Sequence, residues 1–357
     1  MSSRSVPPTD RPRARVLAPL LGLAFVVLCL TSLIGRAAAQ ADIAPPVTKE
    51  PAPTTATTTT APKELTGVAA TTDEKPTLPV YKAAVLGVVE GLTEFLPISS
   101  TGHLLVSQRL LGITSENTPD NVKEAADAYS IVIQAGAILA VVVLYFRRLV
   151  SIAEGVIGRD EDGRKLAISL IVAFVPAAIV GFALEKTIKA HLFGPWPVVA
   201  AWAVGGVALL VLSTSGWWDK ERKGADIVNL SIRSALIIGV AQCLALWPGT
   251  SRSLVTIVAA LLVGLSLSAA VEFSFLLGLL TLSAATALDL VKHGGVIYST
   301  FGALSPIVGF VCAFVAAVVA IRWLVAYIQN HSLAIFGWYR LSIAAITAGL
   351  ILAGTIT

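Results

Sequence analysis

The sequence predicts an all-α polytopic membrane protein, an inverted-topology repeat with six spanning helices and two re-entrant helix pairs. Two observations predict the class. The 357 residues are 55% hydrophobic and 13% charged, whereas a soluble domain has about a quarter charged residues. Apolar segments of spanning length also follow one another along most of the chain. The net charge is only +4, and it indicates no nucleic-acid partner.

Residues 1–41 have the form of a signal peptide or an N-terminal anchor. Arginines precede an apolar run from Val16 to Gly35, and an Ala-x-Ala-like sequence follows it. The run is long for a signal peptide, so cleavage and an uncleaved anchor both stay open. Residues 42–79 are rich in Pro and Thr and lack apolar periodicity, which predicts a disordered linker. The membrane domain is expected over residues 80–357.

Six apolar segments in this domain have the length of a membrane span, and two stretches are interrupted by a proline and polar residues. The limbs of the interrupted stretches are too short to cross, since a span needs about 20 residues. Each is therefore expected to enter the membrane and return to the same side. The interrupted pairs are Val80–Leu96 with Leu104–Leu111 and Leu236–Trp247 with Leu254–Leu265. The expected spans are Ala128–Phe146, Leu166–Leu184, Pro197–Leu212, Phe273–Val291, Ala303–Val325 and Trp338–Ile356.

Basic residues in two loops predict the orientation of the chain. The loop after the first span and the loop after the third span are rich in Arg and Lys, so both should be cytoplasmic. With the linker outside, the first interrupted pair enters from outside and the second from inside. The halves, about residues 80–213 and 234–357, are therefore predicted to be inverted copies. Their sequences agree, because Gly87–Leu92 and Gly239–Leu244 both lead to a proline followed by hydroxyl residues.

The most polar stretch within the apolar region surrounds Pro97. Glu90 and Glu94 are four residues apart, so on a helix they share a face. Pro97 should end that helix, and the hydroxyl residues after it are good N-caps for the next. A charge near the centre of a membrane helix costs about 2.5–3.5 kcal/mol. The cluster therefore predicts a functional site.

Inverted repeats with broken helices bring their breaks together near the bilayer midplane. Irregular backbone at that depth must line a cavity or be buried in protein. We therefore expect one pocket made from both breaks. The first half would supply Glu90, Glu94, Ser99, Ser100, Thr101 and His103, and the second would supply Gly249, Thr250, Ser251, Arg252, Ser253 and Thr256.

Each of these side chains has a functional and a structural interpretation. Arg252 suits phosphate, which its guanidinium binds with two N–H groups, but it also suits an ion pair with a glutamate. Glu90 and Glu94 suit a divalent cation or a shared proton. His103 suits acid/base chemistry or a helix cap, and Ser100 suits nucleophilic attack or a bond to backbone. Together they favour hydrolysis of a lipid-linked phosphate.

Two runs, Glu90–His103 and Pro248–Ser253, closely resemble the signature motifs of the undecaprenyl-diphosphate phosphatase family, the bacitracin-resistance type. Gln134–Val142 and Ala287–Leu290 add to a similarity that extends from about residue 80 to the end. The resemblance implies a dimeric bacterial inner-membrane enzyme with its site open to the outside. It also implies removal of one phosphate from undecaprenyl diphosphate, recycling of the lipid carrier for cell-wall synthesis, and a divalent cation, Mg²⁺ or Ca²⁺.

By position, the resemblance implies catalytic or metal-related roles for Glu90 and Glu94, and roles in the chemistry for Ser100 and His103. It assigns phosphate binding to Ser251 and Arg252 and a supporting role to Thr256. Whether Ser100 or a water attacks phosphorus stays open. The chain has Leu254 where the family usually has Gly, and Ser130 where it often has an acidic residue. Besides Arg252, the expected substrate-binding residues are Ser99, Thr101, Gly249, Thr250, Ser251, Ser253 and Thr256.

Two other functions compete with this hypothesis. A transporter or flippase of polyprenyl phosphate or another anion fits an inverted repeat equally well, but it needs less acid/base chemistry than the carboxylates and His103 offer. The unrelated acid-phosphatase superfamily has similar short motifs. Its mechanism needs a second histidine where this chain has Val258, so we exclude it.

Overall fold

Helices dominate the part of the chain that the computed structural model describes, which comprises residues 78–115, 118, 120–214, 224–301 and 304–356. Within these residues the β-structure is limited to an isolated bridge between Ala225 and Leu265. The predicted signal peptide or anchor, and nearly all of the predicted linker, lie outside the described residues.

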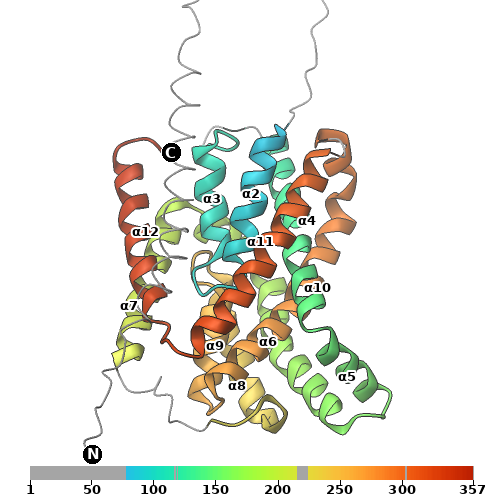
Figure 1. Cartoon of the computed structure of the whole chain (residues 1–357). Coiled ribbons are helices and arrows are strands. Elements are labelled where there is room, and N and C mark those ends of the chain that lie inside the picture. The colour runs from blue at the N-terminus through green and yellow to red at the C-terminus, as the bar shows by residue number, and fades with distance from the viewer. Residues whose placement is uncertain (1–77, 116–117, 119, 215–223, 302–303, 357) are drawn as a thin grey trace, which may run out of the picture. The chain divides into compact units, whose positions relative to one another are not determined.

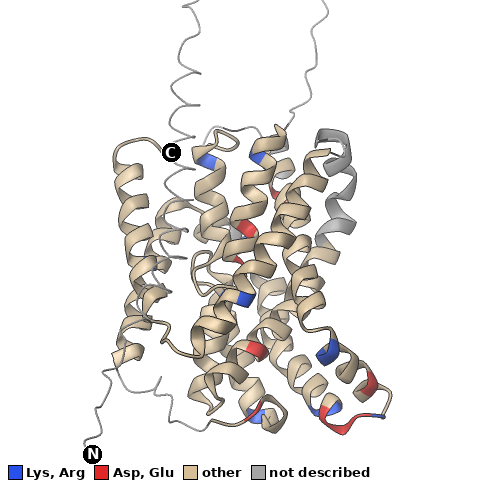
Figure 2. Ribbon diagram, in the orientation of Figure 1, with Lys and Arg blue, Asp and Glu red and all other residues tan. Residues whose placement is uncertain are grey.

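Six helices in the described part are long and apolar enough to cross a membrane, which confirms the six predicted spans. Figure 2 shows that the charged residues gather mainly toward the two ends of the helical unit and are sparse at mid-height. The chain is therefore a multi-pass membrane protein. The long helices are α4 (Asp120–Leu144), α6 (Glu161–Leu192), α7 (Pro195–Thr214), α10 (Leu267–Phe301), α11 (Leu304–Ile328) and α12 (Ala334–Leu352).

Two pairs of short helices interrupt this series. The first pair is α2 (Val80–Thr93) with α3 (Ser100–Leu110), and the second is α8 (Ile232–Gln242), extended by the 3-10 helix η2 (Cys243–Leu246), with α9 (Arg252–Leu262). A short pair followed by long helices thus occurs twice along the chain. In Figure 1, α2 and α3 lie in the upper half and α8 and α9 in the lower half. The re-entrant entry of each pair, and the inversion of the halves across a membrane, stay predictions.

The turn within each short pair, which we call the first break (residues 94–99) and the second break (residues 247–251), ends in the same backbone conformation. Ser99 has φ 73° and ψ 105°, and Ser251 has φ 74° and ψ 112°. In the described part these are the non-glycine residues with positive φ. Pro97 and Pro248 precede them, and proline disfavours helix at its own position and at the residue before it. Such a conformation costs about 1–3 kcal/mol and is typical of functional sites.

A glycine seam fixes the first short pair against α11. A Cβ at Gly87 or Gly91 of α2 would collide with backbone atoms of Gly309 or Ala313. Small residues four apart allow two membrane helices to touch along their backbones. The glycine seam (Gly87, Gly91 and Gly309) therefore holds α2, which carries Glu90, tightly on α11.

A short helix that the sequence analysis did not predict, α5 (Phe146–Val156), follows α4. It occupies the basic loop that was predicted to be cytoplasmic. Arg148 anchors it, because its Nε donates to Glu272 Oε1 of α10 at 2.7 Å. Asp160 ends the turn after α5 by capping α6. The Ser151 hydroxyl and the backbone N–H of Gly163 donate to this carboxylate and lower the pKa of Asp160.

The main hydrophobic core surrounds the two breaks. Phe95, Leu96 and Ile98 of the first break are buried in the same cluster as Ile257 of α9. The Phe95 ring meets Phe275 of α10 edge-on, with centroids 5.4 Å apart. Because these side chains are fully buried, the irregular backbone is surrounded by protein, as membrane depth requires.

Candidate active site

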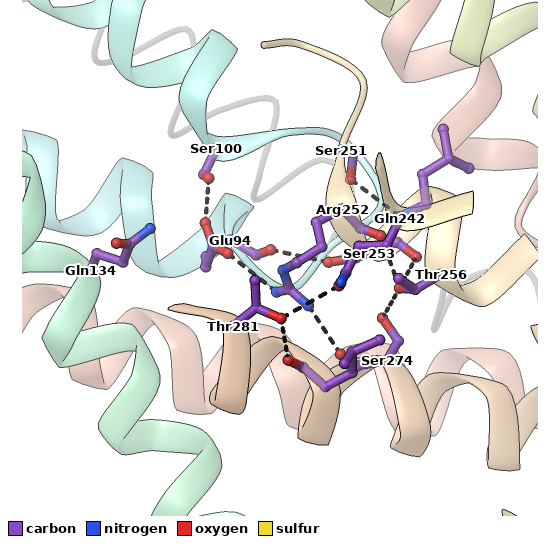
Figure 3. Close-up of polar contacts among 12 residues, drawn as sticks. Glu94, Ser100, Gln134, Gln242, Ser251, Arg252, Ser253, Thr256, Ser274 and Thr281 are labelled. Carbon is purple, nitrogen blue, oxygen red and sulfur yellow. Dashed lines mark hydrogen bonds and ion pairs between the residues drawn. The ribbon is translucent and has the colours of Figure 1, made fainter. Parts of the chain in front are cut away.

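The two breaks lie against each other, as the sequence analysis predicts. Ser253 Oγ donates to the Glu94 carbonyl oxygen at 3.1 Å, and Arg252 Nη2 lies 3.2 Å from Glu94 Oε1. Glu94 is the C-cap of α2, and Arg252 is the first residue of α9. Figure 3 shows the two side chains pointing toward one another. The pocket predicted from two separate motifs therefore has its charged residues together.

Arg252 is held on several sides. Its Nη1 donates to the Ser274 carbonyl oxygen of α10 at 3.0 Å, and its guanidinium carbon lies 5.6 Å from the centre of the Phe95 ring. Gly278 of α10 leaves space for it, since a Cβ there would overlap the guanidinium. Its Nε is buried and has no hydrogen-bond partner among the described residues. The ion pair between Arg252 and Glu94 is thus present, and the Nε–H group of Arg252 is left without an acceptor among the described residues.

Two buried carboxyl groups, those of Glu90 and Glu94, lie together beside Arg252. Glu94 Oε1 pairs with Arg252, and Glu94 Oε2 accepts a hydrogen bond from the Ser100 hydroxyl. Glu90 is 1% exposed and contacts Glu94. Its Oε2 has no hydrogen-bond partner in the part of the chain described. An unpaired buried carboxylate is costly, so this site favours an additional proton or cation.

The hydroxyls that follow the second break brace α9. Thr256 Oγ1 donates to the Arg252 carbonyl oxygen at 2.8 Å and lies 2.6 Å from Ser274 Oγ. Ser251 caps the helix by accepting from the Leu254 N–H at 3.3 Å. Leu254 therefore leaves the helix start intact where the family usually has glycine. Thr250 stays in the turn, where its N–H donates to the Trp247 carbonyl oxygen.

Replacing Ser251 with alanine should lower the melting temperature of the purified protein more than replacing Ser99 does. Both residues precede a helix with positive φ, but only Ser251 makes a capping hydrogen bond. Loss of such a cap costs about 1 kcal/mol. Thermal unfolding of both variants in the same detergent measures the difference. Equal shifts would show that the cap does not stabilise α9.

His103 lies apart from the carboxylates. Its Nδ1 is 2.6 Å from the Ser99 carbonyl oxygen, and its Nε2 is 2.8 Å from the Tyr339 hydroxyl. The ring packs against Trp202 of α7 and stacks on Tyr339 of α12. It is not part of the cavity wall described next. In this arrangement the imidazole supports the first break, and its role in the chemistry stays a prediction.

A cavity of about 520 Å³ lies beside the Glu94–Arg252 pair. Of the predicted site residues, its wall includes Glu94, Ser99, Ser100, Thr101, Gly249, Ser251 and Arg252, whereas Glu90, Thr250, Ser253 and Thr256 are not in it. Most of the remaining wall is apolar and comes from α6, the second break and α10. Apart from Glu185 of α6, the wall away from Glu94 and Arg252 is mostly apolar. Such a cavity suits a ligand with an anionic head and a hydrocarbon tail. The apolar wall includes Phe174, Ala177, Phe182, Leu246, Trp247, Leu282 and Leu288.

The two motifs that form this cavity also fall inside a known family. A family model described as bacitracin resistance protein BacA matches residues 83–346. The chain belongs to the BacA family. The match includes both short helix pairs and nearly all of the long helices, so it covers the whole candidate site.

Relatives of this BacA-family chain carry names that state an activity. A protein of Sorangium cellulosum named undecaprenyl-diphosphatase is 45% identical over 271 residues, which are 76% of this chain and 86% of the relative. Undecaprenyl-diphosphatase 2 of Rhodospirillum rubrum is 43% identical over 281 residues, 78% of this chain and 97% of the relative. Undecaprenyl-diphosphatase 1 of Chromobacterium violaceum is 44% identical over 274 residues, which are 76% of this chain and 96% of the relative.

Four polar residues in the cavity wall have no predicted role in the site: Gln134 of α4, Glu185 of α6, Gln242 of α8 and Thr281 of α10. Thr281 Oγ1 donates to Gln242 Oε1 at 3.5 Å, and Figure 3 shows these residues beside Arg252. Gln242 occupies in the second repeat the place of Glu90 in the first, so the repeat alignment was the signal that could have found it. Gln134 lies within a segment that carries the family resemblance.

The carboxyl groups of Glu90 and Glu94 would supply only part of the ligand set of a divalent cation. The described residues contain no group of three or more His, Cys, Asp or Glu side chains that could hold a metal. Mg²⁺ often takes one or two carboxylates and completes its shell with phosphate oxygens and water. The unpartnered Oε2 of Glu90 beside Glu94 suits that arrangement.

Proposed function

We propose that this protein is an integral membrane phosphatase that hydrolyses undecaprenyl diphosphate to undecaprenyl phosphate and inorganic phosphate. The observation that carries the proposal is the cavity with Arg252, Glu94 and Ser100 at one end and apolar walls beyond. An anionic diphosphate fits the charged end, and a prenyl chain fits the apolar walls. The names of relatives that are 43–45% identical support the same activity. The reaction would recycle the lipid carrier for cell-wall synthesis and give resistance to bacitracin.

Arg252 would bind the diphosphate. Its guanidinium already has one carboxylate partner, and its Nε is buried without a partner among the described residues. Phosphate oxygens would accept a hydrogen bond from Nε and would compete with Glu94 for the N–H groups of Nη2. The exchange would release Glu94 Oε1 at the moment when the substrate arrives. Arg252 would also stabilise the charge that develops on the phosphoryl oxygens.

Glu94 and Ser100 would carry out the proton transfer. The Ser100 hydroxyl donates to Glu94 Oε2, which is the arrangement of a nucleophile and its base. The attacking oxygen, from either the Ser100 hydroxyl or a water, would bond to the terminal phosphorus. The Glu94 carboxylate would take the proton of that oxygen at the same time. The bond from that phosphorus to the bridging oxygen would break, and undecaprenyl phosphate would leave. A covalent phosphoserine would need a second step with water.

Glu90 and Glu94 would hold Mg²⁺ or Ca²⁺ together with substrate oxygens. Bound there, the cation would neutralise charge on the phosphoryl oxygens. The unpartnered Oε2 of the buried Glu90, which contacts Glu94, supports this role. Ser99, Thr101, Gly249 and Ser251 would contact the substrate from the cavity wall. Thr250, Ser253 and Thr256 would act indirectly, through the backbone of the second break and of α9.

We further propose that the protein is a homodimer in the bacterial inner membrane, with the cavity open to the extracytoplasmic side. The basic loops support this orientation, because positively charged loops stay in the cytoplasm. Loss of the lipid carrier's terminal phosphate outside the cytoplasm would match the prediction that the first helix pair enters the membrane from the outside.

Phosphate release from a polyprenyl diphosphate by the purified protein tests the function, and a chelator tests the cation. With Mg²⁺ or Ca²⁺ present we expect release of one phosphate per lipid. EDTA should abolish release, and added cation should restore it, because Arg252 pairs with Glu94 and leaves Glu90 Oε2 without a partner among the described residues. Activity that persists in EDTA after exhaustive dialysis would remove the metal role of both carboxylates.

The same preparation distinguishes the alternative function, a transporter or flippase of polyprenyl phosphate or another anion. The twice-occurring broken helices favour it, because such breaks also form transport sites. Reconstituted vesicles that move the lipid phosphate between leaflets, but release no phosphate with metal present, would favour the transporter.

A further inference from the structure

Arg340 of α12 is a fully buried arginine that binds backbone oxygens. Its side chain is 0% exposed. Its guanidinium donates to the carbonyl oxygens of Pro97 at 3.4 Å, Ala201 at 2.8 Å and Gly249 at 2.9 Å. Among the described residues no carboxylate forms an ion pair with it. It does not line the cavity, so substrate contact does not explain its place.

The carbonyls that Arg340 binds come from both breaks. Pro97 lies in the first break and Gly249 in the second, and Ala201 belongs to α7. A chain that leaves a helix at membrane depth exposes carbonyls that lipid cannot satisfy. One guanidinium supplies donors to both turns at once, which no neutral side chain of similar length would do.

We propose that Arg340 is a positioning residue that joins the two breaks and thereby sets the distance between Glu94 and Arg252. Glu94 begins the first break, and Arg252 directly follows the second. A link between Pro97 and Gly249 therefore fixes the positions of both Glu94 and Arg252. The catalytic consequence rests on the proposed function, whereas the mechanical link does not.

The neighbouring residues of α7 and α12 are shaped for this link. A Cβ at Gly205 of α7 would overlap the Arg340 guanidinium, so the glycine makes the space that the arginine fills. Trp202 of α7 donates from Nε1 to the Ile98 carbonyl oxygen at 2.9 Å, and Tyr339 contacts His103. The first break is thus held from α7 and α12 together. The second break is also held from both helices, because Arg340 binds Gly249 and Trp247 Nε1 donates to the Pro197 carbonyl oxygen of α7 at 3.1 Å.

Three variants test the link in the full chain. Arg340→Met removes the donors, Gly205→Ala displaces the guanidinium and keeps it charged, and Arg340→Lys keeps the charge without the planar fork. The matched control is Arg322→Met, which removes an exposed arginine of α11. Each variant is purified, and its kcat and KM for phosphate release from a polyprenyl diphosphate are measured.

A second measurement does not depend on activity. Spin labels at Tyr81→Cys of α2 and Leu236→Cys of α8, both exposed positions, report the separation of the two short pairs by electron paramagnetic resonance. The native cysteines are first replaced with serine. The distance distribution should be narrow in the wild type and in Arg322→Met, and broad in Arg340→Met and Gly205→Ala.

We expect Arg340→Met and Gly205→Ala to lower kcat by about 100-fold, the effect of misplacing reacting groups by about 1 Å. KM should change little, and Arg340→Lys should recover part of kcat. An unchanged kcat with a narrow distance distribution would overturn the proposal, as would a rise in KM alone. If Arg340→Met does not fold, Gly205→Ala and Arg340→Lys decide. If even the wild type releases no phosphate, the proposed function fails, and the distance measurement still decides whether Arg340 joins the breaks.

Discussion

Replacing Arg252 with alanine is expected to reduce phosphate release by about 1000-fold, the upper range for removing one donor to transition-state charge. The variant loses the cation that faces Glu94 at 3.2 Å and the N–H group that stays unused without substrate. It should still fold, because the cap from Ser251 and the bond from Ser253 to the Glu94 carbonyl oxygen remain. Phosphate release at saturating lipid, with gel filtration of the same sample, measures both.

Arg322→Ala is the matched control for Arg252→Ala, since Arg322 is exposed on α11. Its activity should equal that of the wild type. The rate of phosphate release by Arg252→Lys should lie between those of Arg322→Ala and Arg252→Ala. The ammonium group keeps the positive charge but lacks the planar pair of N–H donors. If Arg252→Ala turned over at a rate close to that of the wild type, the phosphate would have to bind elsewhere in the cavity.

Replacing Glu94 with glutamine should lower kcat by about 10²–10⁴-fold, the range for loss of a general base. The amide is nearly the same size, so the cavity keeps its shape, but it neither accepts the proton of Ser100 nor balances Arg252. Glu94→Asp should be less impaired. Glu154→Gln, an exposed change on α5, provides the matched control. Rates are compared at several Mg²⁺ concentrations, because a metal defect alone is offset by more metal.

Full activity of Glu94→Gln at high Mg²⁺ would assign the carboxylate to the cation alone. Activity that stays low at every Mg²⁺ concentration would support the proton transfer. Ser100→Ala then separates the two attacking groups, since a water mechanism tolerates the loss of the hydroxyl better than a covalent mechanism does.

Much of the fold follows from patterns that act locally. Pro97 and Pro248 each disfavour a continued helix locally, although Pro176 is tolerated inside α6. Spans of about 20 apolar residues are set by the thickness of the membrane. The structure confirms both. Helix α5 was missed because its short amphipathic sequence, rich in charge, is indistinguishable from a basic loop until α6 packs on it. The ends of α12 also shift, from the predicted Trp338 to Ala334, since packing and not hydropathy decides them.

The site was predictable in its residue types but not in its orientations. That Glu94 would meet Arg252 followed from the repeat. The sequence gives no sign that His103 would turn toward Tyr339 instead of the carboxylates, because an imidazole on a helix next to a break has neighbours on both sides. Arg340 was missed for a related reason. A single arginine near the start of a span resembles an interfacial residue, and only tertiary structure reveals its backbone partners.

The glycine seam has a consequence for how a bulky lipid gets in and out. Helices whose backbones touch have little freedom to slide or separate, so α2 and α11 should travel as one rigid body that carries the acidic side of the site. Any widening of the cavity then depends on movement of the opposite wall, which comes from α6, the second break and α10. In that wall, Phe182 of α6 is 80% exposed and Trp247 is 38% exposed. A rotamer change of these two large side chains would connect the cavity sideways to the bilayer without moving the catalytic carboxylates.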